Sequence, residues 1–126
     1  MGEKITITVD GKIFEGKLNE TETAQVIEET LPFEAKPSFW GEEIYFSIPV
    51  GIEENEEPTE KVEVGDIAYW PDGTSFCIFY GPTPGSEDSE PRPASPVTVV
   101  GKLTGEVSLL RDLDPESIER VRVEKG

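Results

Sequence analysis

The chain of 126 residues contains no histidine and only one cysteine, Cys77. The lack of histidine excludes Ser-His-Asp and Cys-His nucleophilic catalysis and removes the imidazole ligands of zinc sites. A single cysteine excludes an intrachain disulfide, which is typical of a reducing compartment. Because Cys77 stands between Phe76 and Ile78, with nothing basic nearby in sequence, we expect a buried apolar side chain and not a nucleophile.

Basic residues and long apolar runs are also scarce. Eleven Lys and Arg against 27 Asp and Glu give a formal net charge of −16. Such a surface repels phosphate groups, so we expect neither nucleic acid nor a membrane as partner. No run approaches the roughly 20 apolar residues of a membrane span, and the N-terminus lacks a signal-like run. We expect a cytoplasmic protein with one domain over residues 1–126, and its oligomeric state stays open.

Alternating apolar and polar residues predict half-buried strands in the first half of the chain. Residues 4–10 alternate in this way, and residues 12–18 return after the Asp10-Gly11 turn as the second strand of a hairpin. Residues 42–50 alternate as well. We expect the apolar members of these strands to form the core: Ile5, Ile7, Val9, Ile44, Phe46 and Ile48.

Residues 20–30 are predicted to form a helix, because apolar residues recur at helical spacing until Pro32 disfavours continuation. Asn19 with Glu22 three residues later is typical of a capping box. Residues 33–41 read as irregular. Further along the chain we expect short strands over 62–64 and 97–103, a short helix or 3₁₀ turn over 106–113, and a final strand within 117–124 that pairs with the N-terminal hairpin.

The stretch from Gly65 to Pro84 predicts a central hairpin. Residues 67–70 and 76–80 are rich in aromatic and β-branched residues, and the Asp72-Gly73 pair between them favours the positive φ of a tight turn. Both strands carry large apolar side chains on both faces, so the face that is turned away from the core needs cover. Residues 81–96 hold five prolines and exceed a simple connection, so we expect this segment to lie over that face.

The segment 51–61 holds five glutamates and is interpreted as a solvated loop. A calcium site there is disfavoured, because the segment lacks the Asp/Asn pattern and central glycine of a calcium loop. We therefore expect no metal and no cofactor.

Some eight short strands and two short helices predict an all-β fold in which a closed antiparallel barrel hides the sheet edges. Four motifs, Leu31-Pro32-Phe33, residues 40–46, residues 65–71 and residues 78–84, resemble those of the small stand-alone prokaryotic cyclophilin-like domain family, over essentially the whole chain. The resemblance implies a closed eight-stranded cyclophilin-like barrel capped by two helices, in a family without an assigned biochemical role.

The residues with which cyclophilins isomerise X-Pro bonds cannot be carried over to this chain. Cyclophilins use an arginine on a Phe-His-Arg stretch, a downstream glutamine, and aromatic and histidine residues that line an outer groove. The strand expected in the arginine's place offers Tyr45, Phe46 and Ser47. The peptide-bond barrier is about 20 kcal/mol, so the missing arginine argues against efficient isomerase activity unless Arg92 swings in from its loop.

Two classes of function remain open. The first is a non-catalytic binding module in which a groove holds a peptide or small molecule. The second is an enzyme, either a weak peptidyl-prolyl isomerase or a small-molecule enzyme that uses Glu43 as acid or base. The simplest alternative for any single aromatic residue is that it only completes the core and its cover. The residues that we expect to line the groove are Glu43, Tyr45, Ser47, Tyr69, Trp70 and Thr83.

Overall fold

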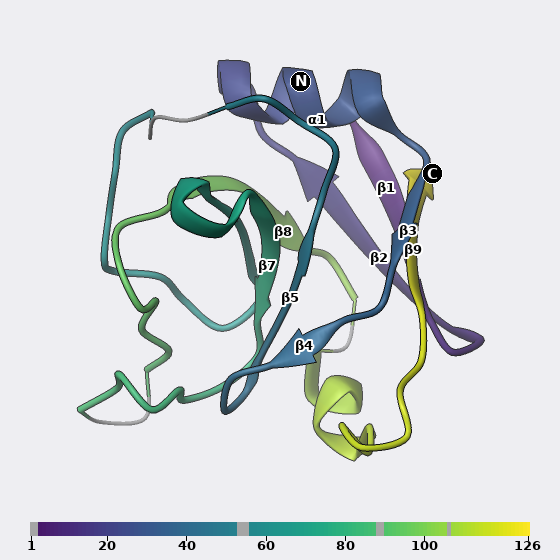
Figure 1. Ribbon diagram of the computed structural model, residues 1–126. Helices are drawn as coiled ribbons and strands as arrows, with labels where there is room; N and C mark the ends of the chain where they lie inside the picture. Colours follow the sequence, from purple (N-terminus) through teal and green to yellow (C-terminus); the bar gives the residue numbers. More distant parts are fainter. Residues whose placement is uncertain (1–2, 53–55, 88–89, 106) are drawn as a thin grey trace.

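A computed structural model describes residues 3–52, 56–87, 90–105 and 107–126 and shows one curled sheet of nine antiparallel strands (Figure 1). The order across the sheet is β3-β9-β1-β2-β8-β6-β7-β5-β4. The strands are β1 (Lys4–Val9), β2 (Lys12–Leu18), β3 (Phe33–Ala35), β4 (Ser38–Phe39), β5 (Glu43–Ser47), β6 (Asp66–Trp70), β7 (Ser75–Phe79), β8 (Thr98–Leu103) and β9 (Val121–Lys125).

The helical elements are one α-helix, α1 (Glu22–Thr30), and two 3₁₀ helices, η1 (Pro71–Gly73) and η2 (Val107–Asp112). The prediction of a short helix or 3₁₀ turn over 106–113 is therefore confirmed as the 3₁₀ helix η2. Residues 62–64 form no strand, whereas the segment read as irregular contains β3 and β4. None of the helices in the described ranges is long and apolar enough to cross a membrane.

The prediction of a closed eight-stranded barrel is wrong, because the sheet is an open half-barrel with β3 and β4 at its two edges. Only Lys36 and Pro37 separate these strands in sequence, yet β3 pairs with β9 while β4 pairs with β5. Pro37 has no N–H to donate, and β3 and β4 are only three and two residues long. The two edge strands are thus joined by the covalent chain, whereas in a closed barrel they would be joined by hydrogen bonds.

The concave side of the sheet holds the main core. All six residues predicted for it are buried, and none is more than 4% exposed. At its centre Phe76 stacks on Phe46 with ring centroids 5.3 Å apart and meets Phe33 edge-on at 5.8 Å. The strict alternation along β1 and β5 therefore identified the inward faces correctly.

Helix α1 lies across one end of the half-barrel (Figure 1). Its N-cap is Thr21, whose hydroxyl accepts from the Ala24 amide at 3.1 Å, so the predicted capping box of Asn19 and Glu22 is wrong. The amides of Glu22 and Thr23 donate instead to the Glu56 carboxylate at 3.2 and 3.0 Å. The glutamate-rich segment therefore supplies a helix cap, which satisfies first-turn amides that a helix leaves without partners.

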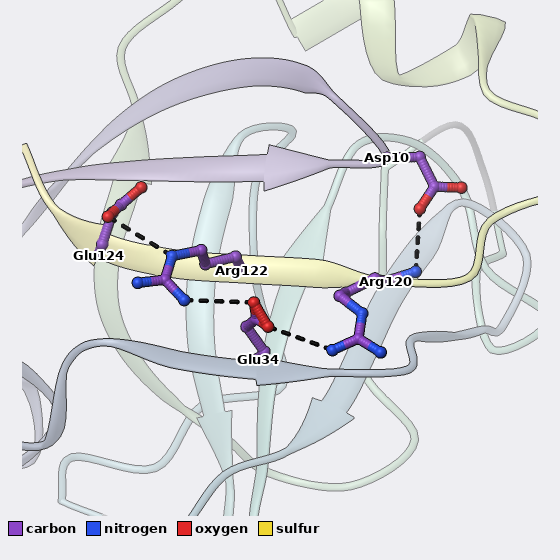
Figure 2. Close-up of polar contacts among 5 residues, drawn as sticks. All are labelled: Asp10, Glu34, Arg120, Arg122 and Glu124. Atoms are coloured by element: carbon purple, nitrogen blue, oxygen red, sulfur yellow. Dashed lines mark hydrogen bonds and ion pairs between the residues drawn. The ribbon is translucent and has the colours of Figure 1, made fainter.

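The edge strand β3 is fastened to β9 by ion pairs (Figure 2). The Glu34 carboxylate accepts from Arg120 and from Arg122, each at 3.2 Å, and the Asp10 carboxylate accepts from the Arg120 amide at 2.9 Å. Strand β9 pairs with β1 on its other side, as predicted. Exposed ion pairs stabilise little by themselves, so the arrangement mainly fixes the register of the short edge.

We predict that Phe76→Ala lowers the free energy of unfolding by about 3 to 5 kcal/mol, because it removes the ring at the centre of the aromatic cluster. Chemical denaturation measures the change. Ile13→Ala on β2 is the control, because Ile13 is 67% exposed and should change the value by about 0.5 kcal/mol or less. Equal losses in the two variants would contradict this placement of the core.

Candidate functional site

The convex side of the sheet carries a second, smaller apolar cluster. Outward side chains of the adjacent strands β5, β6, β7 and β8 meet there, because alternate residues of neighbouring strands share a face. Its buried members are Val62, Ala68, Cys77, Phe79 and Val97, with Tyr45, Trp70 and Val99 packed against them. The central hairpin is therefore covered on both faces.

Side-chain hydrogen bonds tie the covering segment, described over residues 81–87 and 90–96, down over this cluster. The Trp70 indole N–H donates to the Ser95 hydroxyl, which donates to the Asp72 carboxylate at 3.0 Å. Nearer the start of the segment, the Thr83 hydroxyl donates to the Arg92 carbonyl. The covering segment is thus bound to the tip of the central hairpin, and a hydrogen bond between two of its own residues stabilises its path.

The hairpin turn positions Trp70 through Gly73. A Cβ atom at Gly73 would lie 2.6 Å from the Trp70 ring, so only glycine leaves room for it. The predicted positive φ falls on Thr74 (φ 48°) and not on the Asp72-Gly73 pair, because Pro71 starts a 3₁₀ turn that shifts the left-handed residue towards β7. The glycine is needed here for space and not for its dihedral freedom.

Between the cluster and its cover lies a cavity of about 130 Å³. The Tyr45 and Trp70 rings form one corner, with centroids 6.4 Å apart and ring planes at 83°. The partly exposed rings and the exposed Ala94 show that the cavity reaches the surface. Its complete lining consists of Trp40, Glu43, Tyr45, Trp70, Pro93, Ala94 and Val97.

Glu43 is the one ionisable acid in this lining. The residue is only 6% exposed, and burial raises the pKa of its carboxyl to about 7, while a hydrogen bond from the Cys77 thiol works in the opposite direction. Burial, with the nearby Glu43 carboxyl, raises the pKa of the Cys77 thiol well above its usual range. Among the described residues Glu43 has no ion-pair partner, so its carboxyl changes charge near neutral pH.

The structure brings three of the six predicted groove residues together at the cavity, namely Glu43, Tyr45 and Trp70. Tyr69 is fully buried on the opposite face, where its hydroxyl donates to the Ile52 carbonyl at 2.6 Å. Neighbours on a strand point to opposite faces, so Tyr69 and Trp70 cannot line one groove.

The other two predicted residues lie outside the cavity lining. Ser47 is exposed at the far end of β5, where it pairs with Ser75. Thr83 is buried within the covering segment, where its amide donates to the Ser86 hydroxyl at 2.9 Å. Both positions follow from the chain path, which sequence periodicity does not report.

Sequence reasoning missed Trp40, which lies across from Glu43. The Trp40 amide donates to the Glu43 carbonyl at 3.0 Å, so a tight turn between β4 and β5 places both residues at the cavity. Gly41 in this turn has φ +61°, and a Cβ there would lie 2.8 Å from the Thr83 Cα. Gly41, just before an alternating strand, was the available turn signal.

Two larger hollows lie elsewhere, with volumes of about 620 and 450 Å³. The first is bordered by the Asp66–Lys102 ion pair (3.5 Å) and the second by β1, β2 and the end of the chain. Neither has aromatic rings in its lining. In the described part of the chain, no three His, Cys, Asp or Glu residues gather in a way that could hold a metal ion. The cavity beside Trp70 therefore has the strongest features of a binding site.

We predict that Glu43 makes the protein less stable as pH rises from about 4.5 to 7. In this window the folded protein keeps the carboxyl proton that the unfolded chain, with its ordinary pKa of 4.5, has lost. The free energy of unfolding therefore falls with rising pH, by up to about 3 kcal/mol, and stays low above the folded pKa.

Denaturation at about pH 5 and pH 8 tests this titration. In Glu43→Gln the free energy of unfolding should no longer show the fall with pH that Glu43 causes. In Glu63→Gln, a change at an exposed position, the fall should be the same as in the wild type. A decline of wild-type size in Glu43→Gln would contradict the assignment.

Comparison with known proteins agrees with this fold. The solution structure of the hypothetical protein AF2241 from Archaeoglobus fulgidus superposes with a TM-score of 0.82 and is 36% identical in sequence, and the match covers 99% of this chain and 95% of that one. No match was found among curated protein sequences. The family model described as "Cyclophilin-like" matches residues 3–124. The chain therefore belongs to the cyclophilin-like family.

Proposed function

We propose that the protein is a binding module that holds a small molecule, or one side chain of a peptide, in the cavity beside Trp70. One observation carries the proposal: three aromatic rings and a single buried carboxyl surround a space that is otherwise lined by apolar side chains. Ligand sites combine apolar walls with a few oriented polar groups in this way. An apolar cavity of about 150 Å³ in another protein holds benzene, so this slightly smaller cavity, which reaches the surface, can take a ligand group of similar size.

Prolyl isomerase activity lacks its chemical basis on the β5 strand. Tyr45 and Ser47 are the outward residues that follow Glu43, and neither carries a positive charge. Arg92 of the covering segment is not in the cavity lining, and its Nε is buried without a hydrogen-bond partner among the described residues. A bound proline peptide would meet no cationic donor for its carbonyl oxygen.

A second candidate function is general acid–base catalysis on a small molecule by Glu43. The raised pKa of about 7 supports it, because an acid or base works best near the ambient pH. Cys77 offers no nucleophile, since its side chain is fully buried and its thiol pKa is raised. Turnover that Glu43→Gln abolishes, with ligand binding retained, would favour this function over simple binding.

We predict that the protein does not accelerate isomerisation of a proline peptide in a protease-coupled assay. The expected rate equals the uncatalysed rate, because no guanidinium lines the cavity. A cyclophilin serves as the positive control. Acceleration that survives Arg92→Ala would refute the prediction, and acceleration lost in that variant would assign the activity to Arg92.

We also predict that cavity ligands change the intrinsic fluorescence. The two tryptophans of the chain, Trp40 and Trp70, both line the cavity, so all indole emission originates at its wall. A screen of small aromatic and amine compounds should give hits that shift this emission. Tyr45→Ala should weaken their binding by about tenfold, in line with the loss of a buried ring contact, and Ile13→Ala should leave it unchanged.

Hits that bind with wild-type affinity to folded Tyr45→Ala and Trp70→Ala proteins would refute binding in this cavity. In that case the rings would serve only as cover for the outer cluster.

A further inference from the structure

The walls of the cavity are suited to a positive charge. Trp40, Tyr45 and Trp70 contribute to its lining, and the Tyr45 and Trp70 rings meet nearly at right angles. The face of an aromatic ring carries negative electrostatic potential and attracts a cation within about 6 Å of its centroid, most strongly for tryptophan. Several rings around one small space add their attractions to the same bound group.

The single carboxyl in the lining supplies the matching formal charge. Glu43 is buried, and among the described residues it has no cationic partner. A cation that joins an ionised carboxylate in such surroundings stabilises the charged form. The cavity thus contains a carboxyl group that could pair with a bound cation.

The other side chains in the cavity lining provide no cation for Glu43. The titratable side chain that acts on it from β7 is the Cys77 thiol. Tyr45 from β5, Trp70 from β6, Trp40 from the β4–β5 turn, and the segment's Pro93, Ala94 and Val97 bring no charge into the lining. The net charge of −16 further favours cations over anions as ligands.

The lining also selects among cations. A primary ammonium carries three N–H donors, and one carboxyl in an apolar cavity leaves donors without acceptors. A quaternary ammonium has no N–H to satisfy and presents methyl groups to the rings. A quaternary ammonium group is similar in size to benzene, which occupies a cavity of about 150 Å³ in another protein.

We propose that the cavity binds a methylated ammonium group, with the Trp40, Tyr45 and Trp70 rings around the methyl groups and the Glu43 carboxylate as counter-ion. This inference rests on the proposed binding function and narrows its ligand class. Binding the cation favours ionised Glu43, so the carboxyl proton is released to solvent. Affinity should therefore rise with pH until Glu43 is ionised in the free protein.

The test compares choline with its uncharged carbon analogue 3,3-dimethylbutan-1-ol, which has the same shape. Calorimetry and tryptophan emission at about pH 6 and pH 8 report the affinities. We expect choline to bind at least about tenfold more tightly than the alcohol at the higher pH, and to weaken as pH falls, while the alcohol shows no such trend. Glu43→Gln should remove both the preference and the pH dependence, whereas Glu63→Gln should keep them.

Each other outcome overturns the inference. Equal binding of choline and the alcohol, or tighter binding of choline at low pH, rejects the cation and leaves the proposed cavity binding intact. If neither compound binds but aromatic hits from the fluorescence screen do, only the ammonium inference fails. If those hits are also lacking, the proposed function fails with it.

A further set of ligands distinguishes two possible sources of the methylated ammonium group. Tetramethylammonium and choline represent free metabolites, and a short peptide with one trimethyllysine represents a methylated protein. The same peptide with unmodified lysine is the control. Tighter binding of the methylated peptide than of choline would assign the site to protein recognition, and the reverse would assign it to small molecules.

Discussion

The structure depends on the burial of the β6–β7 hairpin from both sides. Phe76 and Ile78 fill the main core, while Cys77 and Phe79 require a second apolar environment on the convex side. If the sheet were covered on one face only, that cluster would be exposed to water. The exposure would cost roughly 25 cal/mol of stability for each Å² of apolar area. The covering segment, described over residues 81–87 and 90–96, meets this requirement, and its position creates the cavity.

The cavity arises because the cover is irregular. A helix would place side chains at regular spacing into the outer cluster, but a proline-rich segment holds its shape without a regular pattern of side chains or backbone bonds. Pro93 and Ala94 therefore approach Tyr45 and Trp70 without filling the space between them. The same fold that carries an arginine-based isomerase site in other proteins here presents rings and a carboxyl, so function follows the site and not the fold.

Local pattern was enough to predict part of the fold. Alternation fixed the inward faces of β1 and β5, and the last strand pairs with the N-terminal hairpin as predicted. The closed barrel was wrong because edge closure depends on strand length and on Pro37, which motif resemblance does not weigh. The η2 segment showed the same limit, since its apolar spacing did not distinguish a 3₁₀ turn from a short helix.

The site was only half predictable for a related reason. Glu43 and Tyr45 share a face through strand periodicity, which can be read from sequence, whereas the register that brings Trp70 beside them is given by the structure. Trp40 enters through a turn, and Pro93, Ala94 and Val97 enter through a long connection whose path depends on hydrogen bonds such as Trp70 to Ser95. Contacts between residues that are distant in sequence left no periodic signal.

The Glu56 cap of helix α1 links local structure to long-range topology. A helix of nine residues is too short to persist alone in water, and two of its first amides are satisfied only by a side chain more than 30 positions away. The Glu56 amide also donates to the Thr98 hydroxyl on β8 at 2.8 Å, so one residue joins the helix start to the middle of the sheet. The cap can form only after a large loop has closed. The stability of the helix start therefore depends on the long-range contacts that hold Glu56 beside it, and closing a loop of this length costs conformational entropy.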